Sequence, residues 1–313
     1  MENIILTLSC LPKVGKKTIL YFIEEMLEKP RDEKDLLDGF IKIKGNNRRI
    51  IVPTLEQLKE AISKTEEIVL NSQRQNIKTI DILNENFPKK LRYIDNAPLI
   101  LFYKGNYNSL INDKSVAIIG SRKADVKGLE ESYRLGAVFG DGKYSVVSGL
   151  AIGCDEQAHK GCLDVRGNTV AVLPCGLDDI YPISNRGLAN KILENEGCLI
   201  SEYPIGMKSF KNNFIERDRI QSGLSSAVIV CEADVHSGTM HTVDFAREQN
   251  RILACLDIEA NGNQKLIKED NCIVIRNKED INRLKLEIDK FNDSFSINNS
   301  KEVNKQLKLE LLK

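Results

Sequence analysis

A cysteine, an aspartate and a histidine lie close together in the stretch VVSGLAIGCDEQAHKGC, residues 146–162. Cys154 could act as a nucleophile only if a base reached it, and His159 lies one helical turn after Asp155. A cysteine directly before an aspartate that opens a helix points away from a histidine at this spacing. The pattern therefore favours a turn held in shape by Asp155 and His159, with Cys154 as a packed thiol, over covalent catalysis.

The tripeptide GSR at residues 120–122 follows an apolar stretch and has the residue types of an anion-binding turn. Gly120 permits a tight turn, Ser121 can cap the next helix, and Arg122 offers phosphate a bidentate donor. A capping turn with a solvated arginine is the alternative for this tripeptide by itself.

The stretch EADVHSGTMHT at residues 232–242 also suits an anion. Ser237, Gly238 and Thr239 precede a helical pattern, and hydroxyl groups with bare amides at a helix N-terminus form an anion cradle. The two histidines of this stretch have a spacing that matches no metal site, so we expect no metal ligands here.

Basic and aromatic residues alternate between residues 201 and 225. Charge for the phosphates and flat faces for base stacking are what single-stranded nucleic acid requires. A solvated loop anchored by two core phenylalanines is the equally open alternative. The residues concerned are Lys208, Lys211, Arg217 and Arg219, with Phe210 and Phe214.

The composition of the 313-residue chain is balanced, with 45 Lys plus Arg and 45 Asp plus Glu, so any basic surface must be local. The eight cysteines are scattered singly without a C-x-x-C pair, which suits neither a zinc site nor a disulfide framework. No stretch approaches the roughly 18 apolar residues that a membrane span needs. We therefore expect a cytoplasmic protein with reduced thiols, no cofactor and no membrane association.

Two kinds of periodicity divide the chain. Residues 1–75 show helical patterns, and a glycine between two of them at residues 11–18 is typical of either a helix-hairpin-helix turn that contacts DNA or a plain helical turn. Residues 76–285 alternate apolar strands with helices, which predicts a doubly wound, mainly parallel, Rossmann-like sheet. Residues 286–313 form a short tail. The expected strands lie at 115–120, 144–149, 168–176, 198–204, 226–233, 251–257 and 272–276.

In order along the chain, the motifs between about residues 87 and 275 resemble those of the DprA/Smf DNA-processing family. They include GSR, SGLAIGCDEQAH, AVLPCGLDDIYP, LISEYP, FIERDRIQSGLS and EADVHSGTMHT. The resemblance implies an extended Rossmann fold behind an N-terminal helical domain of helix-hairpin-helix or SAM type. It also implies a non-catalytic protein that binds single-stranded DNA without sequence preference, forms a homodimer, and loads a RecA-type recombinase during natural transformation and recombination.

The same resemblance implies roles for individual residues in DNA binding. Arg122 would hold a phosphate, Lys211 and Phe214 would contact phosphate and base, and Arg217 and Arg219 would shape a basic pocket. Backbone amides would come from two serine–glycine turns. The complete predicted set is Gly120, Ser121, Arg122, Ser148, Gly149, Lys211, Phe214, Arg217, Arg219, Ser237, Gly238 and Thr239, with no catalytic residue.

Three departures from the family pattern and two other classes of function remain open, one of them a partner-binding scaffold. The family's proline-glycine after the sixth strand is replaced by Leu256–Asp257–Ile258, and its glycine-alanine after NGNQKLI by Asp270–Asn271. The family's R-N-R reads Arg217–Asp218–Arg219, which places a carboxylate in the motif, and no C-terminal winged helix is expected. The other alternative is a nucleotide-binding or nucleotide-hydrolysing enzyme similar to lysine-decarboxylase-like phosphoribohydrolases. Such enzymes carry a catalytic glutamate where this chain has Thr242, with Asp244 two positions later.

Overall fold

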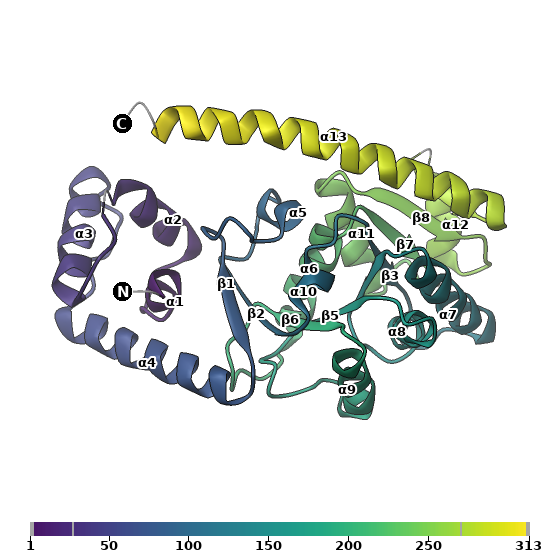
Figure 1. Ribbon diagram of the computed structural model, residues 1–313, viewed down its shortest axis with the longest axis horizontal. Coiled ribbons are helices and arrows are strands. Elements are labelled where there is room, and N and C mark those ends of the chain that lie inside the picture. Colours follow the sequence, from purple (N-terminus) through teal and green to yellow (C-terminus); the bar gives the residue numbers. More distant parts are fainter. Residues whose placement is uncertain (1–2, 27, 270, 311–313) are drawn as a thin grey trace.

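The computed structural model describes residues 3–26, 28–269 and 271–310, with side chains described as far as residue 296. The described residues form a group of N-terminal helices, a nine-stranded sheet with helices on both faces, and a long C-terminal helix (Figure 1). This arrangement confirms the predicted fold class, a mainly parallel Rossmann-like sheet behind a small helical region.

The N-terminal helices pack around two phenylalanines, Phe22 and Phe40, whose ring centroids lie 4.8 Å apart. The third of these helices was not predicted individually; its N-terminus is capped by the Asp32 carboxylate, which accepts from two backbone amides. Thr54 and Gln57 form a capping box at the start of the fourth helix. The helices are α1 (Ile4–Ser9), α2 (Lys16–Glu25), α3 (Glu33–Asn46) and α4 (Leu55–Arg74).

The turn at residues 11–18, between α1 and α2, contacts the sheet region. Lys16 donates through Nζ to Oδ1 of Asn96 at 2.8 Å and to the carbonyl oxygen of Ala97. Burial lowers the pKa of Lys16 to about 8. One hydrophobic core also runs from the N-terminal helices to one end of the sheet, so this turn serves at least in part as an internal contact.

All seven predicted strands are present, and two more precede them. The sheet order is β1-β2-β6-β5-β4-β3-β7-β8-β9. The seven predicted strands run parallel, whereas β1 and β2 join antiparallel at the β6 edge. The strands are β1 (Lys78–Asp81), β2 (Ile100–Gly105), β3 (Ser115–Ile119), β4 (Ser145–Ser148), β5 (Thr169–Leu173), β6 (Cys198–Ser201), β7 (Ala227–Val230), β8 (Ile252–Leu256) and β9 (Cys272–Ile275).

Two helical layers cover the sheet. Leucine, phenylalanine and cysteine side chains of α7 and α8 bury one face, together with the first half of α13; α10, α11 and α12 bury the other. The helices of this region are α5 (Lys89–Arg92), α6 (Tyr107–Leu110), α7 (Val126–Asp141), α8 (Cys154–Asp164), α9 (Arg186–Glu194), α10 (Lys211–Leu224), α11 (Thr239–Glu248), α12 (Asn261–Ile267) and α13 (Lys278–Glu310), with a short 3-10 helix at Ile183–Asn185.

The strand order reverses beside β3. From β3 the chain moves outward through β4, β5 and β6, and it then returns to pair β7 with the other side of β3. In doubly wound sheets a ligand binds outside the carboxyl ends of the strands at such a switch point. The loops that follow β3, β4 and β7 therefore meet where a site is expected.

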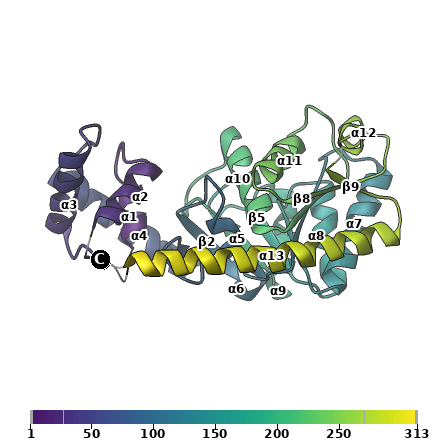
Figure 2. The same ribbon diagram turned by 90° about the horizontal axis from the view of Figure 1, so that it is seen from above.

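Helix α13 runs from the sheet toward the N-terminal helices (Figures 1 and 2). Its first half packs on the sheet through Ile281, Leu284 and Ile288, which are buried. The predicted boundary at residue 286 falls inside this helix, residues 311–313 of the predicted tail lie outside the described residues, and the division into domains stays a prediction. No helix in the described ranges is long and apolar enough to cross a membrane.

Candidate nucleic-acid interface

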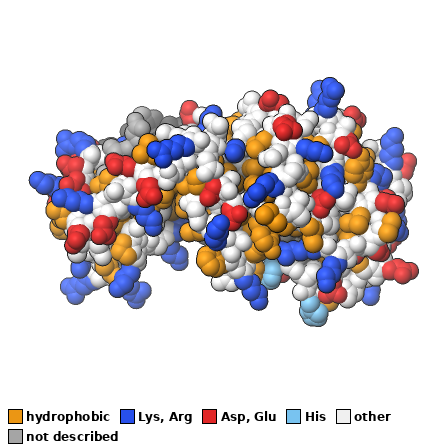
Figure 3. All heavy atoms as spheres, turned by 90° about the horizontal axis from the view of Figure 1, so that it is seen from below, with side chains coloured by type: hydrophobic (Ala, Val, Ile, Leu, Met, Phe, Trp, Pro, Cys, Tyr) orange, Lys and Arg blue, Asp and Glu red, His pale blue; other side chains and the backbone are white. Residues whose placement is uncertain are grey.

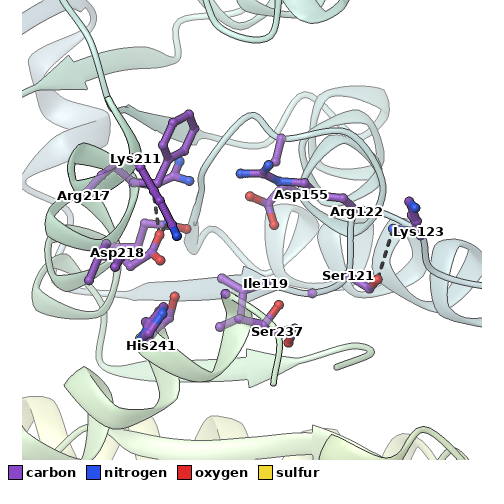
Figure 4. A pocket seen from close by; sticks show the side chains of 18 of the residues that line it. Ile119, Ser121, Arg122, Lys123, Asp155, Lys211, Arg217, Asp218, Ser237 and His241 are labelled. Carbon is purple, nitrogen blue, oxygen red and sulfur yellow. Dashed lines mark hydrogen bonds and ion pairs between the residues drawn. The ribbon is translucent and has the colours of Figure 1, made fainter. Parts of the chain in front are cut away.

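A pocket of about 790 Å³ opens at the switch point of the sheet. Its walls come from the loop after β3, the first turn of α8, one side of α10 and the start of α11 (Figure 4). Most of the predicted site residues meet here. Those that line the pocket are Gly120, Ser121, Arg122, Asp155, Lys211, Phe214, Arg217, Ser237, Gly238 and Thr239.

Three cations of the pocket remain free to meet an anion. Arg122, Lys123 and Lys211 form no ion pair with any residue that the structure describes. The Arg122 guanidinium lies 5.3 Å from the centre of the Phe214 ring, and Tyr181 meets that ring edge-on at 5.3 Å. Phe214 therefore holds Arg122 over the pocket as well as offering an aromatic surface.

The turn that carries Arg122 depends on a close approach of two loops. Gly153, directly before α8, has a positive φ of 86°, and a Cβ at this position would lie 2.4 Å from the carbonyl oxygen of Ser121. The next backbone amide, that of Cys154, donates to the same oxygen at 3.2 Å. Glycine is needed here because any side chain would push the two loops apart.

Arg217 is buried and tied to the protein on several sides. Its Nη1 donates to the carbonyl oxygens of Gly149 and Val172, each at 2.7 Å, and its Nε donates to Asp218 at 3.0 Å. A Cβ at Gly149 would lie 2.0 Å from Nη1. Arg217 thus fixes the wall of the pocket, because its Nε and Nη1 donors are occupied by the fold, whereas Nη2 makes no hydrogen bond with a described residue.

The structure corrects the expected role of the turn at Ser148 and Gly149. The Gly149 amide donates to Oδ2 of Asp155 at 3.0 Å, and the Ser148 hydroxyl donates to the carbonyl oxygen of Ile118 at 2.7 Å. Both groups therefore serve the fold, and Gly149 borders only a small recess of about 70 Å³ beside the main pocket. The loop amide expected from Gly149 is not available to a ligand.

Arg219 also differs from the expectation, because it lies outside the pocket. It is buried and pairs with Glu202 at 2.5 Å and with Glu216 at 3.2 Å. On a helix, positions separated by three or four residues share a face, so Lys211, Phe214 and Arg219 cannot all point the same way. The basic pocket therefore contains Arg217 but not Arg219.

The residues that open α8 do not form a nucleophile with a base. Asp155 accepts from Gly149, and burial raises its pKa. His159 is buried with Nδ1 at 2.7 Å from Oγ1 of Thr169, and burial lowers its pKa to about 3. Cys154 is fully buried, which confirms a packed thiol, and this burial raises its pKa to about 12. Asp155 therefore holds the loop before α8, whereas His159 ties α8 to the start of β5.

The start of α11 presents backbone amides to the pocket. The Ser237 amide and hydroxyl donate to the carbonyl oxygen of Asp234, at 3.0 Å and 2.7 Å. The amides of Gly238 and Thr239 make no hydrogen bond with a described residue. Since the first amides of a helix carry a partial positive charge, these two can donate hydrogen bonds to an anionic ligand.

The predicted site set omits several polar residues that line the pocket, among them Lys123, Gln221 and His241. Gln221 donates through Nε2 to Oδ1 of Asp218 at 3.0 Å, the same atom that Arg217 reaches. Burial raises the pKa of Asp218 to about 6. Phe214, Asp218 and Gln221 follow one another at spacings of four and three residues along α10, so helical periodicity could have placed them on one face.

The position where a phosphoribohydrolase would carry its catalytic glutamate holds no carboxylate. Thr242 is buried beside the pocket. Asp244, two positions later, is 61% exposed and pairs with Arg247 at 2.9 Å. No group of three or more potential metal ligands occurs in the part of the chain that the structure describes.

The family model for DNA recombination-mediator protein A matches residues 78–285. This chain belongs to that family. The match covers all nine strands of the sheet and leaves out the helices α1 to α4 and most of α13. It confirms the resemblance that the strand-end motifs indicate.

Named relatives agree with this family. The protein Smf of Synechocystis is 34% identical over 217 residues; the matched region covers 64% of this chain and 54% of the Synechocystis protein, so the chain spans about half of that relative. The structure of DprA from Streptococcus pneumoniae is similar with a TM-score of 0.64 at 26% identity, over 86% of this chain and 98% of that one. DNA processing protein A from Helicobacter pylori, which binds single-stranded DNA, gives a TM-score of 0.59 at 27% identity, over 71% and 96% of the two chains.

Proposed function

We propose that this member of the recombination-mediator family binds single-stranded DNA in the pocket at the switch point. The observation that carries the proposal is that two unpaired cations, Arg122 and Lys211, face one cavity from two separate elements, with Lys123 at its margin (Figure 4). On the face shown in Figure 3, Lys and Arg side chains are interspersed with Asp and Glu, and the net charge of the chain is zero. A local cluster of unpaired cations is therefore the main source of attraction for phosphate.

The pocket combines the features that a single strand requires. Cations and free helix amides at Gly238 and Thr239 suit the phosphates, and the rings of Phe214 and Tyr181 suit the bases. The volume of about 790 Å³ is enough for a nucleotide together with a neighbouring phosphate. The binding of single-stranded DNA by the Helicobacter pylori relative supports this assignment.

The wider role that we propose follows from the family. The protein acts without catalysis, in the cytoplasm and as a homodimer, and it loads a RecA-type recombinase on the strand that it holds during recombination or transformation. The absence of a carboxylate at the Thr242 position supports a binding role over nucleotide hydrolysis.

Fluorescence anisotropy with labelled oligo-dT at several salt concentrations tests the binding site. We expect salt-sensitive binding by the wild type and a large loss of affinity in the double variant Arg122→Ala, Lys211→Ala. On a single strand, the slope of the logarithm of the binding constant against the logarithm of the salt concentration changes by about 0.7 per phosphate contact. The slope of the double variant should therefore be shallower than that of the wild type by about 1.4.

A control variant with the same loss of charge is Arg74→Ala with Lys191→Ala, which removes two exposed cations outside the pocket. Its binding should match the wild type. Equal losses in the two double variants would show that overall charge, and not this pocket, governs affinity. A folded wild type that does not bind oligo-dT would refute the proposed function.

A further inference from the structure

The small recess beside the main pocket shares a wall with it. Because the two cavities have five lining residues in common, the recess lies directly next to the proposed DNA site. A nucleotide that follows the one in the main pocket can therefore reach it. The residues that line both cavities are Arg122, Ala151, Tyr181, Phe214 and Arg217.

The outer part of the recess is apolar. Ile152 and Tyr181, each 43% exposed, line it together with Pro182, and we call these three residues the apolar platform. The recess, at about 70 Å³, is too small to enclose a base, but a flat ring can lie on the exposed platform from the solvent side. Large apolar side chains gathered beside a polar binding site indicate an interaction surface.

A hydrogen bond and ring packing hold the platform in place. Nδ2 of the buried Asn185 donates to the carbonyl oxygen of Leu150 at 2.9 Å, which joins the loop after β5 to the loop after β4. The Tyr181 ring packs edge-on against Phe214, with the ring centroids 5.3 Å apart. The platform is thus formed before a ligand arrives, and this reduces the entropy that binding loses.

We propose that the apolar platform stacks a second base of single-stranded DNA, next to the nucleotide in the main pocket. This inference rests on the proposed binding of single-stranded DNA to that pocket. Every base has a flat face, and the side chains of Ile152 and Pro182 carry no hydrogen-bonding group, so the platform accepts any base. It adds affinity without adding sequence preference.

Arg122 would contact the phosphate that links the two nucleotides. It lines both cavities, and its guanidinium lies 5.3 Å from the centre of the Phe214 ring in the shared wall. Lys211 faces the main pocket from the opposite side (Figure 4) and does not line the recess. One phosphate would therefore lie between the two bases at Arg122, and another would lie near Lys211.

A strand from which alternate bases are removed distinguishes one stacked base from two. The probes are labelled dT9 and the same strand with every second thymidine replaced by an abasic residue, so that the number of phosphates is unchanged. A site for one base can shift along the alternating strand to find a thymine, and it would bind this strand within about twofold of dT9. Two neighbouring bases are never available on that strand, so we expect the wild type to bind dT9 at least about fivefold more tightly.

Variants of the platform should remove this ratio. Tyr181→Ala should reduce it to about twofold or below, whereas Tyr181→Phe keeps the ring and should retain it. Ile152→Asn, at a residue that lines only the recess, should weaken the binding of dT9 and leave that of the alternating strand as in the wild type. Tyr133→Ala, which removes a partly exposed tyrosine of α7 outside both cavities, is the control and should change neither affinity.

The ratio of the two affinities is the deciding measurement, because Tyr181 also supports Phe214 and its loss can weaken the binding of both strands. A wild-type ratio of about twofold or less, or a larger ratio that persists in both Tyr181→Ala and Ile152→Asn, overturns the inference and leaves the proposed function intact. Failure of the folded wild type to bind dT9 overturns the proposed function itself. Far-ultraviolet circular dichroism of every variant confirms that the comparison is made between folded proteins.

Discussion

Asp218→Asn should stabilise the protein at pH 8 although it removes an ion pair with Arg217. Burial raises the pKa of Asp218 from 3.8 to about 6, even with Arg217 at 3.0 Å. Between these pH values the folded protein keeps a proton that the unfolded chain has lost. The stability that neutral Asp218 contributes is therefore complete below about pH 3.8 and is lost as the pH rises through about 6.

The size of this effect follows from the two pKa values. One pKa unit corresponds to about 1.4 kcal/mol, so this difference in pKa lowers the free energy of unfolding, relative to low pH, by about 3 kcal/mol at pH 8 and by about half as much at pH 5. Asparagine keeps an Oδ1 acceptor for Arg217 and Gln221 and does not ionise. The variant should recover most of the difference.

Urea unfolding followed by circular dichroism at pH 5 and pH 8 measures the effect, and the chain contains no tryptophan that would offer a simpler signal. Asp244→Asn is the matched control; its carboxylate is 61% exposed, so the change should stay within about 0.5 kcal/mol. If Asp218→Asn proves less stable than the wild type at pH 8, the attraction to Arg217 outweighs the burial of the carboxylate and the reasoning is wrong.

Three further predictions concern residues in the pocket or next to it. Gly149→Ala should displace Arg217 and lower the free energy of unfolding by about 1–3 kcal/mol, measured by urea unfolding, because the new methyl group would overlap the guanidinium. Phe214→Leu should weaken oligo-dT binding about three- to fivefold in anisotropy titrations, since Arg122 loses the ring beneath it. Cys154 should resist a thiol reagent at pH 8 in the folded protein and react after unfolding in urea, as mass spectrometry would show; rapid modification of the native protein would contradict its packing.

The sequence predicts the parallel strands well because each is a continuous apolar run, and all except the edge strand β9 are buried on both faces. It did not predict β1, since KTID at Lys78–Asp81 is short and carries two charges, as edge strands often do. Helix α3 was missed because its sequence, EKDLLDGFIKIKGN, contains two glycines that weaken a helical pattern. Strand ends could be located from the sequence, and with them most of the residues of the pocket.

The errors within the site concern the direction of side chains. Arg217 and Arg219 have the same charge and lie two residues apart, yet one lines the pocket and the other pairs with Glu202 on a different side of α10. Charge and motif position do not distinguish them, whereas helical phase does. The amide of Gly149 was misjudged for a related reason, because only the fold shows that Asp155 already occupies it.

The contacts of Arg217 also bear on the order of folding. They join α10 to Val172, 45 positions earlier in the chain, and to Gly149, 68 positions earlier. These two residues lie at the ends of the neighbouring strands β5 and β4. Contacts between such distant segments form late, because closing long loops loses entropy before any contact is gained. A chain newly released from denaturant should therefore regain its helical signal before its ability to hold a ligand in this cavity.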